Sequence, residues 1–253
     1  MEPAFQECFT ALDAAERAVV LTGAGVSTLS GIPDFRGRSG MYRSTWNGIP
    51  RETLLEIGFF RRNPELFYRF AAEELYPMLD KEPSIAHTVP ARLQQLGVFG
   101  RLYTQNIDGL HDKAGAASCE LHGTLASHRC LECGKSFPLH EIRSQAAAGK
   151  VPRCSCGGLI KPEVVFYGEM LNEALLEQAF QDFETADFAL VLGSSLVVTP
   201  VASLPAETLR NRGRLAIVNE QPTPYDREAA FRFPDIGSFC RAAGEYPAWR
   251  ENG

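Results

Sequence analysis

The stretch that decides the fold is Ala18-Val19-Val20-Leu21-Thr22-Gly23-Ala24-Gly25-Val26-Ser27-Thr28. Its first half, residues 18–22, is an apolar run of the kind that forms a parallel strand buried on both faces. Its second half has the first two glycines of a dinucleotide-binding fingerprint, with Thr28 in place of the third. Such glycines let the backbone turn tightly and approach a pyrophosphate, although the same turn also occurs without a ligand.

Three further runs, residues 101–104, 188–193 and 215–218, have the same apolar character as the first. Helical patterns lie between these runs, and the clearest begins after Asn172, a residue that commonly caps helices. Because strands alternate with helices in this way, the sequence predicts a doubly wound parallel sheet.

Two segments interrupt this rhythm. Residues 32–80 begin with a loop rich in Pro, Gly and Arg and continue into a region dense in Phe and Tyr, which predicts an inserted helical cap with an entrance loop. Residues 124–164 contain few apolar side chains but many cysteines. A bound metal would have to stabilise this second segment, because it cannot build a core of its own.

The composition is that of a folded protein, with 45% hydrophobic and 22% charged residues. The formal net charge of −6 provides no field that would attract nucleic acid or an anionic membrane. The N-terminus has acidic residues where a secretory signal needs basic ones, and no long apolar stretch follows. We therefore expect a cytoplasmic protein that binds neither membranes nor nucleic acid directly.

The cysteines predict a metal site. Four of the seven lie close together as Cys130-x2-Cys133 and Cys154-x-Cys156, a spacing typical of a structural zinc site in a reducing compartment. Four thiolates complete the tetrahedral shell and leave no position for a catalytic water. The sequence thus predicts one structural zinc ion.

Two polar motifs are candidates for ligand binding. Ser30-Gly31-Ile32-Pro33-Asp34-Phe35-Arg36-Gly37 combines an acid and an arginine in a density that a structural loop does not need. Thr104-Gln105-Asn106-Ile107-Asp108 begins at the carboxyl end of a predicted strand, where open α/β sheets bind their ligands. An Asx turn would explain Asp108 alone but not the whole run.

The candidate general base is His122, which stands in Glu120-Leu121-His122-Gly123. An imidazole, whose ordinary pKa is about 6.5, suits proton transfer at neutral pH. We interpret His87, His128 and His140 as structural or surface residues, and leave His111 open.

Three more motifs follow along the chain: Lys161-Pro162-Glu163-Val164-Val165-Phe166-Tyr167-Gly168-Glu169, Gly193-Ser194-Ser195-Leu196 and Val218-Asn219. Together with Gly23-Ala24-Gly25-Val26-Ser27, residues 30–37, residues 104–108, His122-Gly123 and the four cysteines, they resemble the sirtuins of bacterial type, a family of NAD-dependent protein deacylases. The motifs occur in the family's order from about residue 18 to residue 220.

The resemblance implies an α/β fold in which a Rossmann-like doubly wound parallel sheet carries a smaller inserted domain. Residues 1–35, 80–123 and 165–253 would form the NAD-binding domain. Residues 36–79 would form the helical part of the small domain with its cofactor loop, and residues 124–164 its zinc-binding module.

The resemblance also implies which residues bind the two substrates. NAD would lie between the domains, and the acyl-lysine peptide would add as a strand between residues 164–168 and the segment after Ser195. The implied NAD-binding residues are Gly23, Ala24, Gly25, Thr28, Asp34, Phe35, Arg36, Gln105, Asn106, Ile107, Asp108, Gly193, Ser194, Ser195, Asn219 and Glu220. The implied peptide-binding residues are Val165, Phe166, Tyr167, Gly168 and Val197.

The implied reaction moves an acetyl group from a lysine side chain of a protein to ADP-ribose. The amide oxygen of the acetyl-lysine attacks the ribose carbon as nicotinamide leaves, so that NAD is consumed. Neutral His122 then takes a proton from a ribose hydroxyl, and that oxygen attacks the imidate. The expected partners are acetyl-lysine proteins, and the enzyme is expected to be a monomer.

Two positions depart from the family's pattern. Tyr167 stands where Phe is frequent, which places an extra hydroxyl near the peptide. Members that remove acidic acyl groups have a Tyr followed three residues later by an Arg, and here Tyr68 is followed by Ala71. The departure predicts a preference for acetyl over succinyl, and a smaller preference in Ala71→Arg.

Other functions remain open at this point. Within the family, the alternatives are removal of longer acyl groups and ADP-ribosyl transfer to proteins. The glycine turn alone would also allow a nicotinamide-dependent oxidoreductase, although the third glycine and a clear acid about 20 residues later are missing. A non-enzymatic zinc-ribbon binding module would not need so many polar residues around a cleft.

Overall fold

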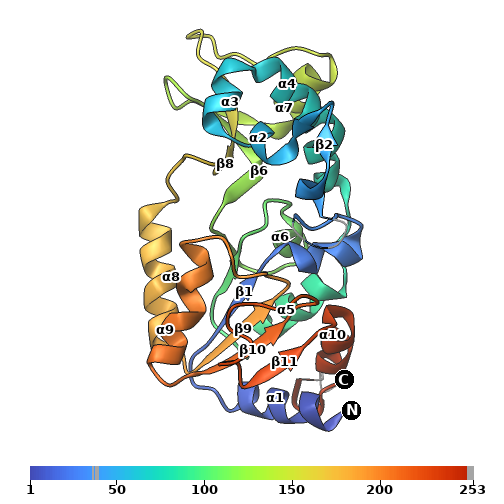
Figure 1. Ribbon diagram of the computed structural model, residues 1–253, viewed down its shortest axis with the longest axis vertical. Helices are drawn as coiled ribbons and strands as arrows, with labels where there is room; N and C mark the ends of the chain where they lie inside the picture. Colours follow the sequence, from blue (N-terminus) through green and yellow to red (C-terminus); the bar gives the residue numbers. More distant parts are fainter. Residues whose placement is uncertain (36, 38–39, 250–253) are drawn as a thin grey trace.

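The computed structural model describes residues 1–35, 37 and 40–249. The molecule is elongated, with a six-stranded sheet between helices in one half and a smaller domain in the other (Figure 1). None of the described helices is long and apolar enough to cross a membrane.

All strand pairs of the large sheet are parallel, in the order β5-β4-β1-β9-β10-β11. Numbered along the chain, this is the 3-2-1-4-5-6 order of dinucleotide-binding Rossmann sheets, and the direction of winding reverses between β1 and β9. The strands are β1 (Ala18–Thr22), β4 (Leu102–Thr104), β5 (Ser118–Glu120), β9 (Phe188–Leu192), β10 (Arg214–Val218) and β11 (Phe231–Phe233).

The four predicted strands are confirmed to within one residue at each end. In β1, Val20 packs into the core on one face of the sheet, whereas Val19 and Leu21 pack into the core on the other. Because alternate side chains point to opposite faces, burial on both sides requires the continuous apolar run seen in the sequence. The doubly wound fold is therefore as expected.

The two edge strands, β5 and β11, were not predicted. Each has three residues, and β5 is only half-buried along its length. Strands this short have too few residues to show a periodic pattern, and their pairing comes from the neighbouring strand rather than from their own sequence.

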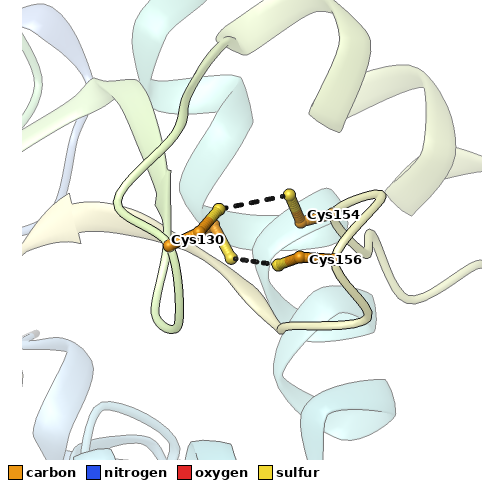
Figure 2. Close-up of side chains that lie close together, drawn as sticks. Cys130, Cys154 and Cys156 are labelled. Carbon is orange, nitrogen blue, oxygen red and sulfur yellow. Dashed lines mark hydrogen bonds between the residues drawn. The ribbon is translucent and has the colours of Figure 1, made fainter.

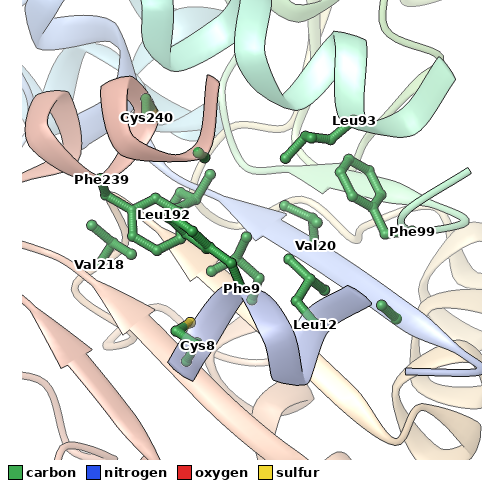
Figure 3. Packing of buried hydrophobic residues seen from close by; sticks show 14 of the residues in the cluster. Cys8, Phe9, Leu12, Val20, Leu93, Phe99, Leu192, Val218, Phe239 and Cys240 are labelled. Atoms are coloured by element: carbon green, nitrogen blue, oxygen red, sulfur yellow. The ribbon is translucent and has the colours of Figure 1, made fainter. Parts of the chain in front are cut away.

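Helices cover both faces of the sheet. Phe9 and Leu12 of α1 pack against Val20 of β1 and Leu192 of β9, beside Phe239 of α10 (Figure 3). The opposite face is covered by α8, whose Asn172 cap accepts a hydrogen bond from the Leu175 N–H as the sequence suggested. The covering helices are α1 (Pro3–Asp13), α5 (Ile85–Gln95) and α10 (Ile236–Gly244) on one face, and α8 (Glu173–Thr185) and α9 (Leu204–Arg210) on the other.

The small domain combines short helices with an antiparallel sheet in the order β7-β6-β8. Its strands are β6 (Gly123–Cys130), β7 (Ser136–Pro138) and β8 (Ile160–Val164), with the two-stranded pair β2 (Thr45–Trp46) and β3 (Ile49–Pro50). Its helices are α2 (Arg51–Leu54), α3 (Ile57–Arg62), α4 (Pro64–Phe70), η3 (Ala71–Leu75), η4 (Tyr76–Asp80) and α7 (Leu139–Ala147). The remaining short helices are η1 (Ala24–Ser30), η2 (Met41–Arg43), α6 (Leu110–Lys113), η5 (Val201–Ser203) and η6 (Pro247–Trp249).

The two inserted segments share one hydrophobic core, which joins the helical region to the cysteine-rich region. The buried Tyr68 hydroxyl donates to the Ile160 carbonyl oxygen at 2.5 Å, and the Tyr76 hydroxyl lies 3.0 Å from His128 Nε2. The cysteine-rich region therefore shares its core with a segment some 50 to 90 residues earlier in the chain.

Candidate active site

A cavity of about 580 Å³ lies at the carboxyl ends of the central strands and is walled on its other side by the small domain. Gly23 follows β1, Gln105 follows β4, Gly193 follows β9 and Asn219 follows β10, and all four line it. A volume of this size is typical of sites that bind small molecules and cofactors. Its place at the carboxyl edge, beside the reversal of strand order, is that of the ligand site in Rossmann sheets.

The glycines after β1 and β9 allow two turns to approach very closely. The Gly25 N–H donates to the Gly193 carbonyl oxygen at 2.9 Å, and the Gly23 N–H donates to the Leu192 carbonyl oxygen at 2.9 Å. Gly193 has φ +65°, and a Cβ on it would lie 2.5 Å from the Val26 nitrogen. The glycine turn after β1 leads into the 3-10 helix η1 rather than into an α-helix.

Gly193→Ala is expected to lower the free energy of unfolding by about 3 kcal/mol. About 1–2 kcal/mol comes from the left-handed backbone conformation and the rest from the clash with backbone atoms. Urea denaturation measures it, with Gly97→Ala as the control, because Gly97 has φ +74° but a Cβ added to it would meet no other heavy atom within 4 Å. Equal losses in the two variants would contradict the close approach.

His122 has a defined tautomer. Its Nδ1 lies 3.1 Å from the main-chain oxygen of Gln105. Because a carbonyl oxygen can only accept, Nδ1 carries the hydrogen and the lone pair lies on Nε2. The ring lines the cavity, and its neutral form has the tautomer that a general base needs.

Asn106 is held by a buried network behind the cavity wall. Its amide nitrogen donates to Gly23 O at 3.2 Å and to Ser27 Oγ at 3.1 Å, which uses both amide hydrogens. Ser27 Oγ in turn donates to Asp108 Oδ2 at 2.7 Å. The side-chain oxygen is thus what Asn106 can still offer to a ligand in the cavity that it lines.

The NAD-binding and peptide-binding residues implied by the resemblance mostly come together here. Of the described ones, all line the cavity except Asp108, which is buried behind it, and Val197, which is 54% exposed and outside the lining. Arg36 lies outside the described residues. Gln105 Nε2 also donates to Ser194 Oγ at 2.7 Å, which links the turns after β4 and β9.

Several lining residues were not found from the sequence. The turn Pro234-Asp235-Ile236-Gly237 follows β11 and closes one side of the cavity. Recognising residues 231–233 as a strand would have placed this turn at the ligand-binding edge. The others include Leu29, Tyr42, Leu55, Met170, Leu171, Leu176 and the residues Val198, Thr199 and Pro200.

The segment after β8 forms the wall opposite the glycine turn. The Val165 N–H donates to the His122 carbonyl oxygen at 2.8 Å. Tyr167 is held by Leu55 O and the Ile57 N–H at 2.9 and 3.1 Å, in a parallel bridge with the small domain. His122 and the candidate peptide-binding segment are therefore fixed to one another.

The four clustered cysteines fit a zinc ion. Cys130, Cys133, Cys154 and Cys156 present their sulfur atoms from two loops, all within 4.8 Å of one another (Figure 2). The 3.6 Å separations of Cys130 from Cys156 and of Cys133 from Cys154 are close to the edge of a tetrahedron with Zn–S bonds, about 3.8 Å. Main-chain N–H groups of Cys133 and Cys156 lower the pKa values of the Cys130 and Cys154 thiols, which favours the thiolates that zinc binds.

A Rossmann sheet with a histidine in the cavity at its carboxyl edge, and with a four-thiol module in the attached small domain, defines an enzyme of the dinucleotide-using α/β class. The family model described as "Sir2 family" matches residues 23–200 of the chain. A protein named NAD-dependent protein deacetylase from Thermotoga maritima is 40% identical over 243 residues, covering 95% of this chain and 97% of that protein. The chain belongs to the Sir2 family.

Solved structures of Sir2 proteins are similar to this chain in both sequence and fold. A Sir2 variant with deacetylated p53 peptide and 3'-O-acetyl ADP-ribose is 40% identical, with a TM-score of 0.90 over 95% of this chain and 97% of that one. A Sir2 complex with p53 peptide and NAD⁺ is also 40% identical, with a TM-score of 0.88 over 97% of this chain and 98% of that one.

Proposed function

We propose that this protein is an NAD-dependent protein lysine deacetylase that transfers the acetyl group to ADP-ribose and releases nicotinamide. The observation that carries the proposal is His122, which lines the same cavity as the glycine turn and the segment after β8 and has its Nδ1 held by the Gln105 carbonyl oxygen. The similar protein named NAD-dependent protein deacetylase supports the same activity.

In this proposal NAD occupies the part of the cavity beside the glycine turns. The glycines let the turns after β1 and β9 pack against one another at this end of the cavity, and the N–H groups of Gly23, Gly25 and Gly193 donate to other main-chain oxygens there. Gln105, Asn106 and Ile107 face the nicotinamide ribose and carboxamide, while Asn219 and Glu220 lie on the adenine side. Asp108 acts from behind, through Ser27 and Asn106.

The chemistry follows from these positions. The acetyl-lysine amide oxygen bonds to the ribose carbon as the bond to nicotinamide breaks. His122 Nε2 then takes the proton of a ribose hydroxyl, and Gln105 O stabilises the imidazolium through its hydrogen bond to Nδ1. The ribose oxygen attacks the imidate carbon, water replaces the lysine nitrogen, and the products are lysine and acetylated ADP-ribose.

The acetyl-lysine peptide is placed along residues 165–168. Val165 O and the Gly168 N–H have no hydrogen bond to another described residue, so they are the main-chain groups offered to an added strand. The partners are proteins with acetylated lysine. We also propose that the enzyme acts as a cytoplasmic monomer without nucleic acid, in line with its net charge of −6.

One assay tests the function. An acetyl-lysine peptide and NAD are incubated with the protein, and the products are identified by mass. A deacetylase yields free lysine peptide, nicotinamide and acetylated ADP-ribose. An oxidoreductase would instead raise the absorbance of reduced nicotinamide, and that outcome would contradict the proposal.

The charges of the residues that line the cavity affect which acyl groups the enzyme can accept. None of the described lining residues is Lys or Arg, whereas Asp34, Glu169, Glu173, Glu220 and Asp235 are acidic. An acidic acyl group would thus meet no cationic partner among the described lining residues, and an unpaired carboxylate taken out of water costs several kcal/mol.

We expect kcat/KM for an acetyl-lysine peptide to exceed that for the same peptide with succinyl-lysine by at least about 100-fold. The measurement compares two peptides that differ only in the acyl group. Similar values would show that a cation reaches the acyl group.

The structure changes the expected effect of Ala71→Arg. Ala71 is fully buried in the small-domain core, and the Tyr68 hydroxyl is bonded to Ile160 O; neither residue lines the cavity. An arginine at position 71 would therefore bury a charge in an apolar core and lower stability, rather than narrow the acyl preference.

A further inference from the structure

Lys161 is a buried cation beside the active-site wall that the reaction itself does not use. It lies on β8, is 6% exposed and does not line the cavity. Its ammonium group donates to Val164 O at 2.6 Å and to Pro162 O at 3.0 Å, and lies 2.8 Å from Glu169 Oε2. Three acceptors for one nitrogen match the three hydrogens of the charged form.

Glu169 connects this ammonium group to the middle of the candidate peptide-binding segment. Its Oε2 also accepts the Phe166 N–H at 2.8 Å, and its own N–H donates to Phe166 O at 2.9 Å. Both main-chain groups of Phe166 are thus held by Glu169. The Phe166 ring lies under the ammonium group at 4.2 Å and packs into the small-domain core.

Together these contacts close a loop between the two ends of residues 161–169. Lys161 binds the segment at Val164, Glu169 binds it at Phe166, and the small domain binds it at Tyr167. Val165 O and the Gly168 N–H remain as main-chain groups without a described partner. The same contacts that stabilise the loop therefore decide which groups can pair with a substrate strand.

Burial lowers the pKa of Lys161, and the ion pair with Glu169 opposes that shift. Removing one partner of a buried pair leaves the other charged and unpaired. The carboxylate of Glu169, 25% exposed in its side chain, would then turn toward water and release the Phe166 N–H.

We propose that Lys161 is a positioning residue for the acyl-lysine peptide. Through Glu169 it keeps residues 164–169 in the shape that accepts the substrate strand, without touching peptide or NAD. This inference rests on the proposed deacetylase function. It assigns Lys161 to peptide binding and not to the binding of NAD.

Lys161→Met is the main test, because methionine keeps an unbranched apolar chain but has no charge. We expect KM for the acetyl-lysine peptide, and Kd for a fluorescent acetyl-lysine peptide measured without NAD, to rise about tenfold. KM for NAD and kcat at saturating peptide should stay within about twofold. Lys161→Arg restores a charged donor and should recover most of the peptide affinity.

Arg129→Met is the matched control. Arg129 lies on the adjacent strand β6 and pairs with Glu163 at 2.5 Å, but its side chain is 58% exposed. Losing this exposed ion pair removes one charge from the same sheet and should leave peptide KM unchanged.

The outcomes separate the two proposals. A wild-type protein that does not deacetylate the peptide would overturn the proposed function. An active wild type with equal peptide KM in Lys161→Met and Arg129→Met, or with peptide KM and NAD KM raised alike, would overturn the positioning role. If Lys161→Met does not fold, Glu169→Gln carries the test, and unchanged peptide affinity in that variant overturns the proposal.

Discussion

Replacing His122 with alanine is expected to lower the rate of deacetylation about 100- to 10,000-fold, the usual contribution of a general base. The physical reason is the tautomer: Nδ1–H binds Gln105 O, so Nε2 is the nitrogen that accepts the proton. Neither the sheet nor the glycine turns depend on the imidazole, and NAD binding should persist. The measurements are kcat with saturating peptide, NAD binding by calorimetry and the melting temperature.

The proposed order of steps sharpens this test. Because His122 acts after nicotinamide has left, exchange of labelled nicotinamide into NAD in the presence of peptide should fall much less than deacetylation. His140→Ala is the control, since His140 is exposed at the start of α7 and should be silent. Unchanged deacetylation in His122→Ala would exclude this residue as the base.

Removal of the zinc ion is expected to unfold the small domain and abolish activity. Cys130 and Cys154 are buried members of the core that the two inserted segments share, so the metal and that core stabilise one another. β8 runs from this module to Val164 at the cavity wall, and its disorder would remove the candidate peptide-binding segment.

Cys133→Ala, with three thiols left, should lose most of its zinc and show the same loss of structure. Zinc content by mass spectrometry, circular dichroism and deacetylation are the measurements. Cys119→Ala is the control, because Cys119 lies on β5 outside the cluster. A metal-free protein with wild-type melting temperature and turnover would refute a structural zinc.

Local patterns allowed much of the sheet to be predicted. The four interior strands are apolar on both faces, so each appears in the sequence as a continuous apolar run. The start of α8 could be predicted because one residue, Asn172, is a typical helix cap. The edge strands β5 and β11 could not be predicted, because three residues are too few to show an alternation of apolar and polar side chains. The cavity wall at residues 234–237 was missed with them.

The expectation that the side chains at positions 68 and 71 lie beside the acyl group was wrong for a different reason. Helical spacing says which residues share a face but not what that face meets. The structure turns Tyr68 toward Ile160, some 90 residues later in the chain, and leaves both side chains away from the cavity.

By itself the sequence determined the parallel sheet, the glycine turn after its first strand and the four-cysteine site, because each depends on residues close together in the chain. Only the tertiary structure decided that Gly193 packs against Gly25, that the two insertions share a core, and that Lys161 holds the segment after β8. It also decided the tautomer of His122, through its contact with Gln105. The physical reason is that a hydrogen bond or a packing contact depends on atoms within a few ångströms, and the chain brings those atoms together only when it folds.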